Sequence, residues 1–256
     1  MEYIKKVAEK ELWNAGKVEL WDLSRCNTNE ESRVECISQI ASICYGKPPK
    51  DAKRLVERLW TESGGLPSSA LEFIRLVNPD GSHSGITDSL RNWTKMPTLE
   101  SIAWPIESDL RIHRANIATF RLTVPIFIAR QVMRHRQFSY QERSLRFTKV
   151  GLDDAIWYIP PDASMDVHNL FAEAYEKEIV VYTKLLEAGV PREQARAVLG
   201  VGLSTELWMQ GDVPAWKNYF KLRLEKHTQK EHRELAQAML DLLEEHQPEL
   251  WRKVRP

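Results

Sequence analysis

The residues whose types could do chemistry gather in one stretch, from Arg130 to Arg146. It holds five arginines and a histidine against a single acid, Glu142. The stretch follows directly on the apolar run Val124–Ala129, so its charges stand where a hydrophobic segment ends. Because an unpaired charge is too costly to keep in a partly desolvated place, arginines there need anionic partners. A guanidinium is a planar fork that suits phosphates and planar carbonyl groups, so the stretch predicts a site for phosphorylated, planar ligands.

Part of this stretch also has a purely structural explanation. Pro125 is typical of the first turn of a helix, which predicts a helix over roughly 125–136. Cations near the C-terminus of that helix are favourable in any case, and this alone would account for Arg134 and Arg136. It would not account for the polar pattern that continues from Ser139 to Arg146, so the ligand site is the favoured interpretation.

The order Arg-His-Arg-x-x-Ser-x-x-Glu-x-Ser-x-Arg over residues 134–146 resembles the signature of the flavin-dependent thymidylate synthases. It resembles in particular the phage-type members, which have glutamine at the position of Gln141. The likeness covers about 115–235, with a weaker match near 63–73. It implies an α+β fold in which a small, mainly antiparallel sheet packs with long helices. We expect a single domain over 1–256, with an insertion at about 74–113 where the family has almost nothing.

The resemblance implies reductive methylation of dUMP at C5 to give dTMP. The family uses bound FAD, with NADPH and methylenetetrahydrofolate as co-substrates, in a homotetramer whose active sites are shared between subunits. The residues suit this chemistry, because a guanidinium at the O4–N3 edge of the pyrimidine would stabilise the anion that makes C5 nucleophilic. The flavin would perform the reduction while the protein orients it. No cysteine–histidine pair stands near the arginines, and the flavin-dependent enzymes, unlike the classical thymidylate synthases, need none.

The family's roles can be carried over position by position. Arg223 matches the arginine that polarises the pyrimidine and is the expected catalytic residue. The cofactor-binding residues implied are Arg134, His135, Arg136, Glu142, Asn218 and, more weakly, Ser69. The substrate-binding residues implied are Gln131, Arg134, Ser144, Arg146, Arg196 and Arg223. No metal site is implied.

Each of these residues also has an ordinary explanation. Arg196 could be a solvated surface charge, and Arg223 could complement a helix dipole. Gln131 and Ser144 could be ordinary polar surface, and His135 could be a packed core histidine. The 27 residues between Arg196 and Arg223 also follow the family, which favours the functional interpretation.

Two departures from the family touch the flavin and nucleotide contacts. The segment Pro67–Phe73 lacks two histidines that members usually carry, and Asp212-Val213-Pro214 replaces an Asn-x-Arg. His113-Arg114 could substitute for one missing histidine. These changes keep open a divergent flavoenzyme that methylates or hydroxymethylates a related pyrimidine nucleotide such as UMP. A non-catalytic nucleotide- or nucleic-acid-binding protein is a further alternative, but a formal net charge of zero counts against nucleic acid as a partner.

The surrounding pattern predicts the elements that hold these residues. Strands are expected at 17–24, 115–124 and 203–210, and helices at 30–45, 50–62 and 166–188. Three further helices are expected to begin after Pro191, after an N-cap at Asp212, and at a capping box formed by Thr228–Glu231. A chain of 256 residues that is 43% hydrophobic can bury one core. No apolar window approaches a membrane span, so we expect a cytoplasmic protein (host cytoplasm if phage-encoded) without a membrane partner.

Overall fold

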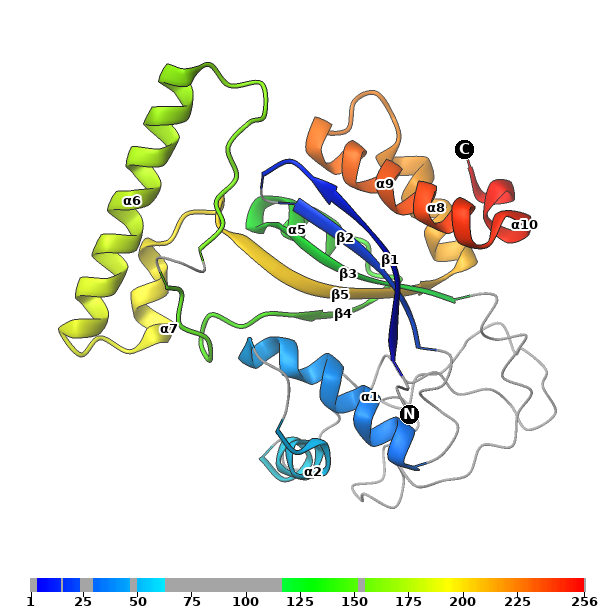
Figure 1. Cartoon of the computed structure of the whole chain (residues 1–256), viewed down its shortest axis with the longest axis horizontal. Helices are drawn as coiled ribbons and strands as arrows, with labels where there is room; N and C mark the ends of the chain where they lie inside the picture. The colour runs from blue at the N-terminus through cyan, green and yellow to red at the C-terminus, as the bar shows by residue number, and fades with distance from the viewer. Residues whose placement is uncertain are drawn as a thin grey trace.

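The computed structural model describes residues 4–14, 16–23, 30–46, 50–62, 117–151 and 155–255. In these ranges five strands form one sheet in which every neighbouring pair is antiparallel. The spatial order is β1 (Lys5–Leu12), β2 (Gly16–Asp22), β3 (Ile117–Pro125), β5 (Ser204–Asp212) and β4 (Ser139–Glu142). Together with the long helices described below, this confirms the predicted α+β class (Figure 1).

Helices cover both faces of the sheet. One face packs against α8 (Val213–Arg223), α9 (Lys230–His246) and α10 (Pro248–Trp251), and a short 3-10 turn, η5 (Arg252–Val254), follows. The other face packs against α1 (Glu30–Ser42), which continues into η1 (Ile43–Tyr45) and lies beside α2 (Ala52–Glu62). Beyond the end of the sheet lie α6 (Met165–Glu187), α7 (Arg192–Ala195) and η4 (Arg196–Val198) (Figure 1).

The main core lies between the sheet and α8–α9. Side chains alternate along a strand, so Phe120, Leu122 and Val124 of β3 all point to this core and are fully buried. Trp216 of α8 packs on Phe120 with its ring edge-on, at 5.2 Å between centroids. Its indole nitrogen donates to the carbonyl oxygen of Gly211, at 3.0 Å. Burial of these large apolar groups fixes α8 against the sheet, and α8 carries Arg223.

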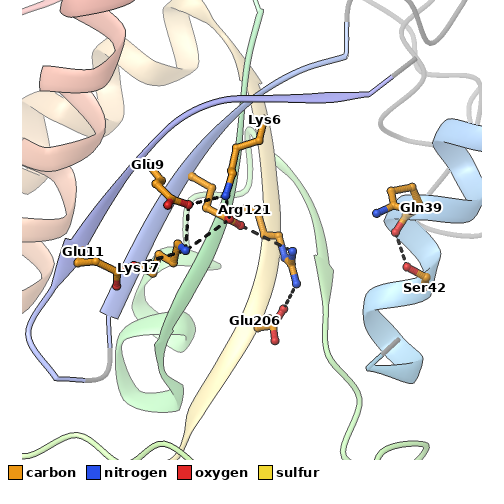
Figure 2. Close-up of polar contacts among 9 residues, drawn as sticks. Lys6, Glu9, Glu11, Lys17, Gln39, Ser42, Arg121 and Glu206 are labelled. Carbon is orange, nitrogen blue, oxygen red and sulfur yellow. Dashed lines mark hydrogen bonds and ion pairs between the residues drawn. The ribbon is translucent and has the colours of Figure 1, made fainter. Parts of the chain in front are cut away.

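The intervening strand residues point to the opposite face, where charges of alternating sign form a ladder across strands (Figure 2). Arg121 of β3 pairs with Glu206 of β5 and lies 3.7 Å from Glu19 of β2. Lys6 of β1 lies 3.4 Å from the other carboxylate oxygen of Glu19. Opposite charges on adjacent strands stabilise the pairing they face, so the ladder supports the register that the core residues specify.

Several predicted elements are confirmed. The strand at 17–24 is β2, that at 115–124 is β3, and that at 203–210 is β5; the helices at 30–45, 50–62 and 166–188 are α1 with η1, α2 and α6. Pro191 and Asp212 stand at the N-caps of α7 and α8, as predicted. β1 and β4 were not predicted.

Two predictions at element ends were wrong. The helix expected over 125–136 is α5 (Ile126–Val132), which ends earlier because the chain turns at once to enter β4. The capping box is absent: Gln229 occupies the N-cap of α9, without a side-chain cap. The hydroxyl of Thr228 instead donates to the carbonyl oxygen of Leu222, and Glu231 accepts from the hydroxyl of Tyr158.

Some predictions fall outside the described residues. These are Ser69, the departure at Pro67–Phe73, His113-Arg114 and the insertion at about 74–113. None of the helices in the described part of the chain is long and apolar enough to cross a membrane.

Candidate functional site

The loop that carries Arg134, His135 and Arg136 is tightly built. The amide of Arg134 donates to the carbonyl oxygen of Gln131, and the amide of His135 donates to that of Val132, at 3.3 and 3.1 Å. The Tyr140 hydroxyl, from β4, lies 2.8 Å from the carbonyl oxygen of Val132 and 3.0 Å from that of His135. A strand residue thus ties the loop to the end of α5, so the loop's side chains start from a fixed backbone.

A second anchor holds the loop from beneath. Phe138 is buried and packs edge-on against Trp216, with ring centroids 4.6 Å apart. Its ring lies directly over Gly211 of β5, where a Cβ would collide with the ring carbons. The glycine is therefore required by the close approach of Phe138.

Arg223 reaches this loop from the last turn of α8. Its Nε donates to Nε2 of His135 at 2.7 Å. Burial, aided by the nearby Arg223 charge, lowers the pKa of His135 to about 4, so the imidazole is neutral at pH 7 and carries its proton on Nδ1. A neutral acceptor orients the guanidinium without neutralising it. In the described part of the chain the two terminal nitrogens of Arg223 have no hydrogen-bond partner.

The neighbouring cations are also without counter-ions. Arg134 and Arg136 are exposed, and within the residues that the structure covers neither guanidinium makes a hydrogen bond or an ion pair. Asn218, one turn before Arg223, makes a long contact of 3.4 Å with the side chain of Gln137. Arg134, Arg136 and Arg223, with His135 and Asn218, are called the His135 cluster below. Three cations without acidic partners among the described residues are the donor set that an anionic ligand would require.

Behind this cluster lie two polar side chains, those of His232 and Tyr219, that the sequence did not single out. Gln131 contacts His232 of α9, which in turn contacts Tyr219 of α8, and both of these deeper residues are fully buried. The only signal in the sequence is a histidine at an apolar position of an amphipathic helix, and a packed core histidine has the same pattern.

A second group forms at the other end of β4. Arg146 pairs with the carboxylate of Glu193 at 3.2 Å, and Nε of Arg196 donates to the carbonyl oxygen of the same glutamate, also at 3.2 Å. The hydroxyl of Ser144 accepts from the amide of Arg146 at 3.3 Å. Ser144, Arg146 and Arg196 are called the Arg146 cluster. Glu193 partly offsets its charge, but both arginines have nitrogens left for a further acceptor.

Glu142 sits on β4 between these segments and is largely buried. Burial raises the pKa of its carboxyl group, and a hydrogen bond with Thr205 and the charge of Arg130 partly oppose that shift. Gln141 points to the other face of the sheet, where its amide nitrogen donates to the sulfur of Cys44 at 2.6 Å. Gln141 therefore ties β4 to the 3-10 turn that follows α1, whereas Glu142 is held by Thr205 and Arg130.

The two clusters lie on different parts of the molecule. The Arg146 cluster sits with α7 beside α6, whereas Arg223 and Asn218 sit on α8 on the far side of the sheet (Figure 1). The structure thus brings His135 and Arg223 into contact, with Gln131 beside them, but leaves Ser144, Arg146 and Arg196 apart from them within one chain. Among the described residues no group of three or more His, Cys, Asp or Glu side chains could hold a metal ion.

Comparison with known proteins gives one consistent family. The family described as thymidylate synthase complementing protein matches residues 109–249, more than half of the chain. A flavin-dependent thymidylate synthase of Synechocystis sp. is 32% identical over 148 residues, which cover 51% of this chain and 67% of that protein. Another, from Thermotoga neapolitana, is 35% identical over 140 residues, covering 52% and 63%. The chain spans about two thirds of the length of these curated relatives.

A solved structure also resembles part of the chain. It is the UMP/dUMP methylase PolB from Streptomyces cacaoi bound with 5-Br dUMP, at 29% sequence identity and a TM-score of 0.46. The match covers 50% of this chain and 66% of that chain.

Proposed function

The chain belongs to the family of the flavin-dependent thymidylate synthases, and from this premise we propose that it methylates dUMP at C5 to give dTMP. FAD is the bound cofactor, and methylenetetrahydrofolate and NADPH are the co-substrates. The observation that carries the proposal is the contact between Arg223 and His135, in which a neutral imidazole orients a fully charged guanidinium.

Arg223 is the catalytic residue of this proposal. Attack by C5 on a one-carbon unit requires negative charge to build up on O4 and N3 of the pyrimidine. The terminal nitrogens of Arg223 stabilise that charge as it develops, and His135 holds them in place before the reaction begins. A carboxylate in the position of His135 would cancel most of this effect, because it would neutralise the guanidinium.

The donor set fits a dinucleotide cofactor. FAD carries a diphosphate, and Arg134 and Arg136 are exposed guanidiniums without protein acceptors in the described residues. Asn218 and Glu142 add an amide and a carboxyl group nearby, and Ser69 is assigned from the family pattern alone. When bound and reduced, the flavin supplies the hydride that the methylation consumes. The protein's part is to hold the cofactor against the nucleotide.

The nucleotide phosphate and sugar are assigned to Ser144, Arg146 and Arg196, and the base to Gln131, Arg134 and Arg223. Because the Arg146 and His135 clusters lie apart in one chain, a complete site takes one cluster from each of two subunits. This supports an assembly, which we propose to be a homotetramer as in the family.

The surface of α6 supports the same assembly. Two apolar side chains near its N-terminus, Val167 and Leu170, are 41% and 67% exposed. Figure 1 shows the N-terminal half of α6 standing away from the sheet, where Tyr175 stacks on Trp157 of the segment that precedes the helix. Large apolar side chains left exposed three residues apart on one helix are typical of a contact between subunits.

The test combines cofactor binding with turnover. The purified protein should bind FAD, the flavin bands should shift on addition of dUMP, and tritium should be released from C5 of labelled dUMP. Arg223→Lys should keep FAD bound but lower the rate of tritium release by about 100-fold or more, the usual loss when a preorganised charge donor is removed. Arg252→Lys changes an exposed arginine far along the chain and should leave the rate unchanged.

The substrate arm of this test uses UMP in place of dUMP. Faster release from UMP would replace the proposed reaction by the alternative, a flavoenzyme acting on a related pyrimidine nucleotide. A protein that takes up no FAD would contradict both. Salt-sensitive binding of DNA or RNA without turnover would favour a non-catalytic binding protein.

A further inference from the structure

A row of four polar side chains, buried at one end and exposed at the other, lies directly behind the His135 cluster. The hydroxyl of Tyr219 is 3.1 Å from Nε2 of His232, and Nδ1 of His232 is 3.2 Å from Oε1 of Gln131. The amide nitrogen of Gln131 then donates to Oε1 of Gln229 at 2.6 Å. The row runs from the fully buried core of α8 and α9 to the partly exposed end of α5.

His232 is out of place for a packing residue. The other buried residues of α9 are all apolar. A polar ring in such a setting costs free energy unless its nitrogens are hydrogen-bonded, and here each of them has a partner. An apolar side chain would fill the space at a lower cost in free energy. The hydrogen bonds of its two ring nitrogens, and not its packing, therefore explain a histidine at this position.

The partners determine where the proton of His232 lies. Burial, with the charges of Arg223 and His135, lowers the pKa of His232 to about 3, so the ring is neutral. The carbonyl oxygen of Gln131 can only accept, so Nδ1 carries the proton and Nε2 accepts from the hydroxyl of Tyr219. Donors therefore run in one direction, from Tyr219 through His232 and Gln131 to Gln229.

We propose that His232 is a positioning residue that holds the side-chain amide of Gln131 in one of its two orientations. Oε1 of Gln131 is fixed on His232 and Nε2 on Gln229, which leaves one N–H and one lone pair in defined directions for the nucleotide. This role rests on the proposed function, in which Gln131 binds the pyrimidine nucleotide. Tyr219 acts one step further back: its hydroxyl donates to Nε2 of His232 and so satisfies the nitrogen that carries no proton in the tautomer that the carbonyl oxygen of Gln131 requires.

Three substitutions at one position separate this role from simple packing. The amide group of an asparagine reaches the place of Nδ1, whereas that of a glutamine reaches the place of Nε2. His232→Asn can therefore still donate to Gln131, but His232→Gln and His232→Phe cannot. Dissociation constants for dUMP are measured by calorimetry on the FAD-loaded protein, together with KM and kcat.

We expect His232→Phe and His232→Gln to raise the dissociation constant and KM for dUMP about three- to tenfold, the worth of one neutral hydrogen bond. The value of kcat should change by less than about twofold, because the guanidinium of Arg223 stays in place. His232→Asn should bind dUMP nearly as the unaltered protein does. His246→Gln, an exposed histidine on the same helix, is the matched control. Equal weakening by all three His232 variants would overturn the proposal in favour of packing.

The tautomer gives a readout that needs no ligand. In ¹⁵N-resolved NMR spectra of the free protein, His232 should be neutral with its proton on Nδ1, and Gln131→Ala should release that preference, because the carbonyl oxygen of Gln131 is the partner that can only accept. A proton on Nε2 in the unaltered protein would overturn the proposal, because Nδ1 could then not donate to Gln131.

Gln131→Ala separates failure of this proposal from failure of the proposed function. It should weaken dUMP binding by itself, and His232→Phe should add little on top of it, because both act through one contact. If Gln131→Ala weakens binding while His232→Phe does not, the positioning role is wrong and the proposed function stands. Failure of dUMP to bind the unaltered protein would overturn the proposed function, and this role of His232 with it.

Discussion

Arg223 and His135 divide two tasks that a single ion pair could not perform together. A carboxylate would hold the guanidinium of Arg223 firmly, but it would neutralise the positive charge that the proposed reaction uses to stabilise the pyrimidine. Water would leave that charge intact but would not fix the position of the guanidinium. The imidazole of His135 fixes the guanidinium through one hydrogen bond and stays neutral, because burial disfavours its protonated form. Acid should therefore disturb the site through its histidines.

Acid should also lower the stability of the fold. The pKa of His232 is about 3 in the folded chain, against an ordinary value of 6.5, so between these values the unfolded chain binds a proton that the folded chain does not. The free energy of unfolding therefore falls as the pH falls below 6.5. Going from pH 7.5 to about pH 5 should cost about 2 kcal/mol from His232 alone. His135 acts in the same direction.

Urea denaturation at both pH values measures this dependence. His232→Phe should show a smaller loss of stability on acidification, whereas His246→Gln, with its exposed ring, should behave like the unaltered chain. An equal pH dependence in His232→Phe would mean that other groups cause the acid sensitivity.

The sequence predicted the residues that could bind a ligand, but not the buried residues that contact them from the core. Arg134 and Arg136 stand in the arginine-rich stretch, and Arg223 was assigned because it matches a position in the family pattern. His232 and Tyr219 could not be singled out in this way, because a histidine and a tyrosine on the buried side of a helix look the same whether or not they bond to each other. Only the packing of α8 on α9 brings their polar atoms together.

At the scale of elements, the arginine loop depends on a strand and a helix that lie far from it in sequence. Phe138 lies over Gly211 of β5 and against Trp216 of α8, so β5, α8 and the loop share one contact. The absence of a side chain at Gly211 is what allows it. A substitution on β5 should therefore change the positions of Arg134 and Arg136 on the loop.

Gly211→Ala tests that dependence. The added methyl group would displace the ring of Phe138, which should cost about 1–3 kcal/mol of stability and weaken FAD binding by loosening the loop. Chemical denaturation and FAD titration measure the two effects. Combining it with Phe138→Leu should recover part of both, since a smaller side chain relieves the collision. If Gly211→Ala alone is as stable and binds FAD as well as the unaltered protein, Phe138 does not anchor the loop.

The strands that could not be predicted from the sequence are those that lack the alternating residue pattern typical of a strand. β1 is an edge strand, rich in charges and mostly exposed, so its pattern lacks a buried side. β4 has four residues, too few for a period of two to be visible, and is held by its pairing with β5. The capping box failed because Thr228 and Glu231 found partners outside α9, which no local pattern records. Long, strongly apolar elements such as β3 and β5 were predictable because most of their residues are buried.

At the scale of the whole molecule, one chain contains both clusters of the proposed site but does not bring them into contact. In the proposed site the His135 cluster provides cations for a cofactor and for the pyrimidine, and the Arg146 cluster provides cations for a phosphate. Figure 1 shows α7, which lies with the Arg146 cluster, near the opposite end of the sheet from α8. A second copy that covers the exposed side of α6 could bring its own Arg146 cluster to the first copy's His135 cluster. Activity would then belong to the assembly and not to the chain.

Mixing two inactive variants tests this directly. Arg223→Ala removes the proposed catalytic guanidinium, and the double change Arg146→Ala and Arg196→Ala removes the proposed phosphate contacts. Each variant alone should therefore release almost no tritium from dUMP. If each site takes one cluster from each of two subunits, random co-assembly restores both clusters at about a quarter of the sites. Tritium release should then reappear on mixing and subunit exchange, to roughly that fraction of the unaltered rate. Variants that assemble together yet stay inactive would place both clusters of a site in the same chain, and the division of the site between subunits would be wrong.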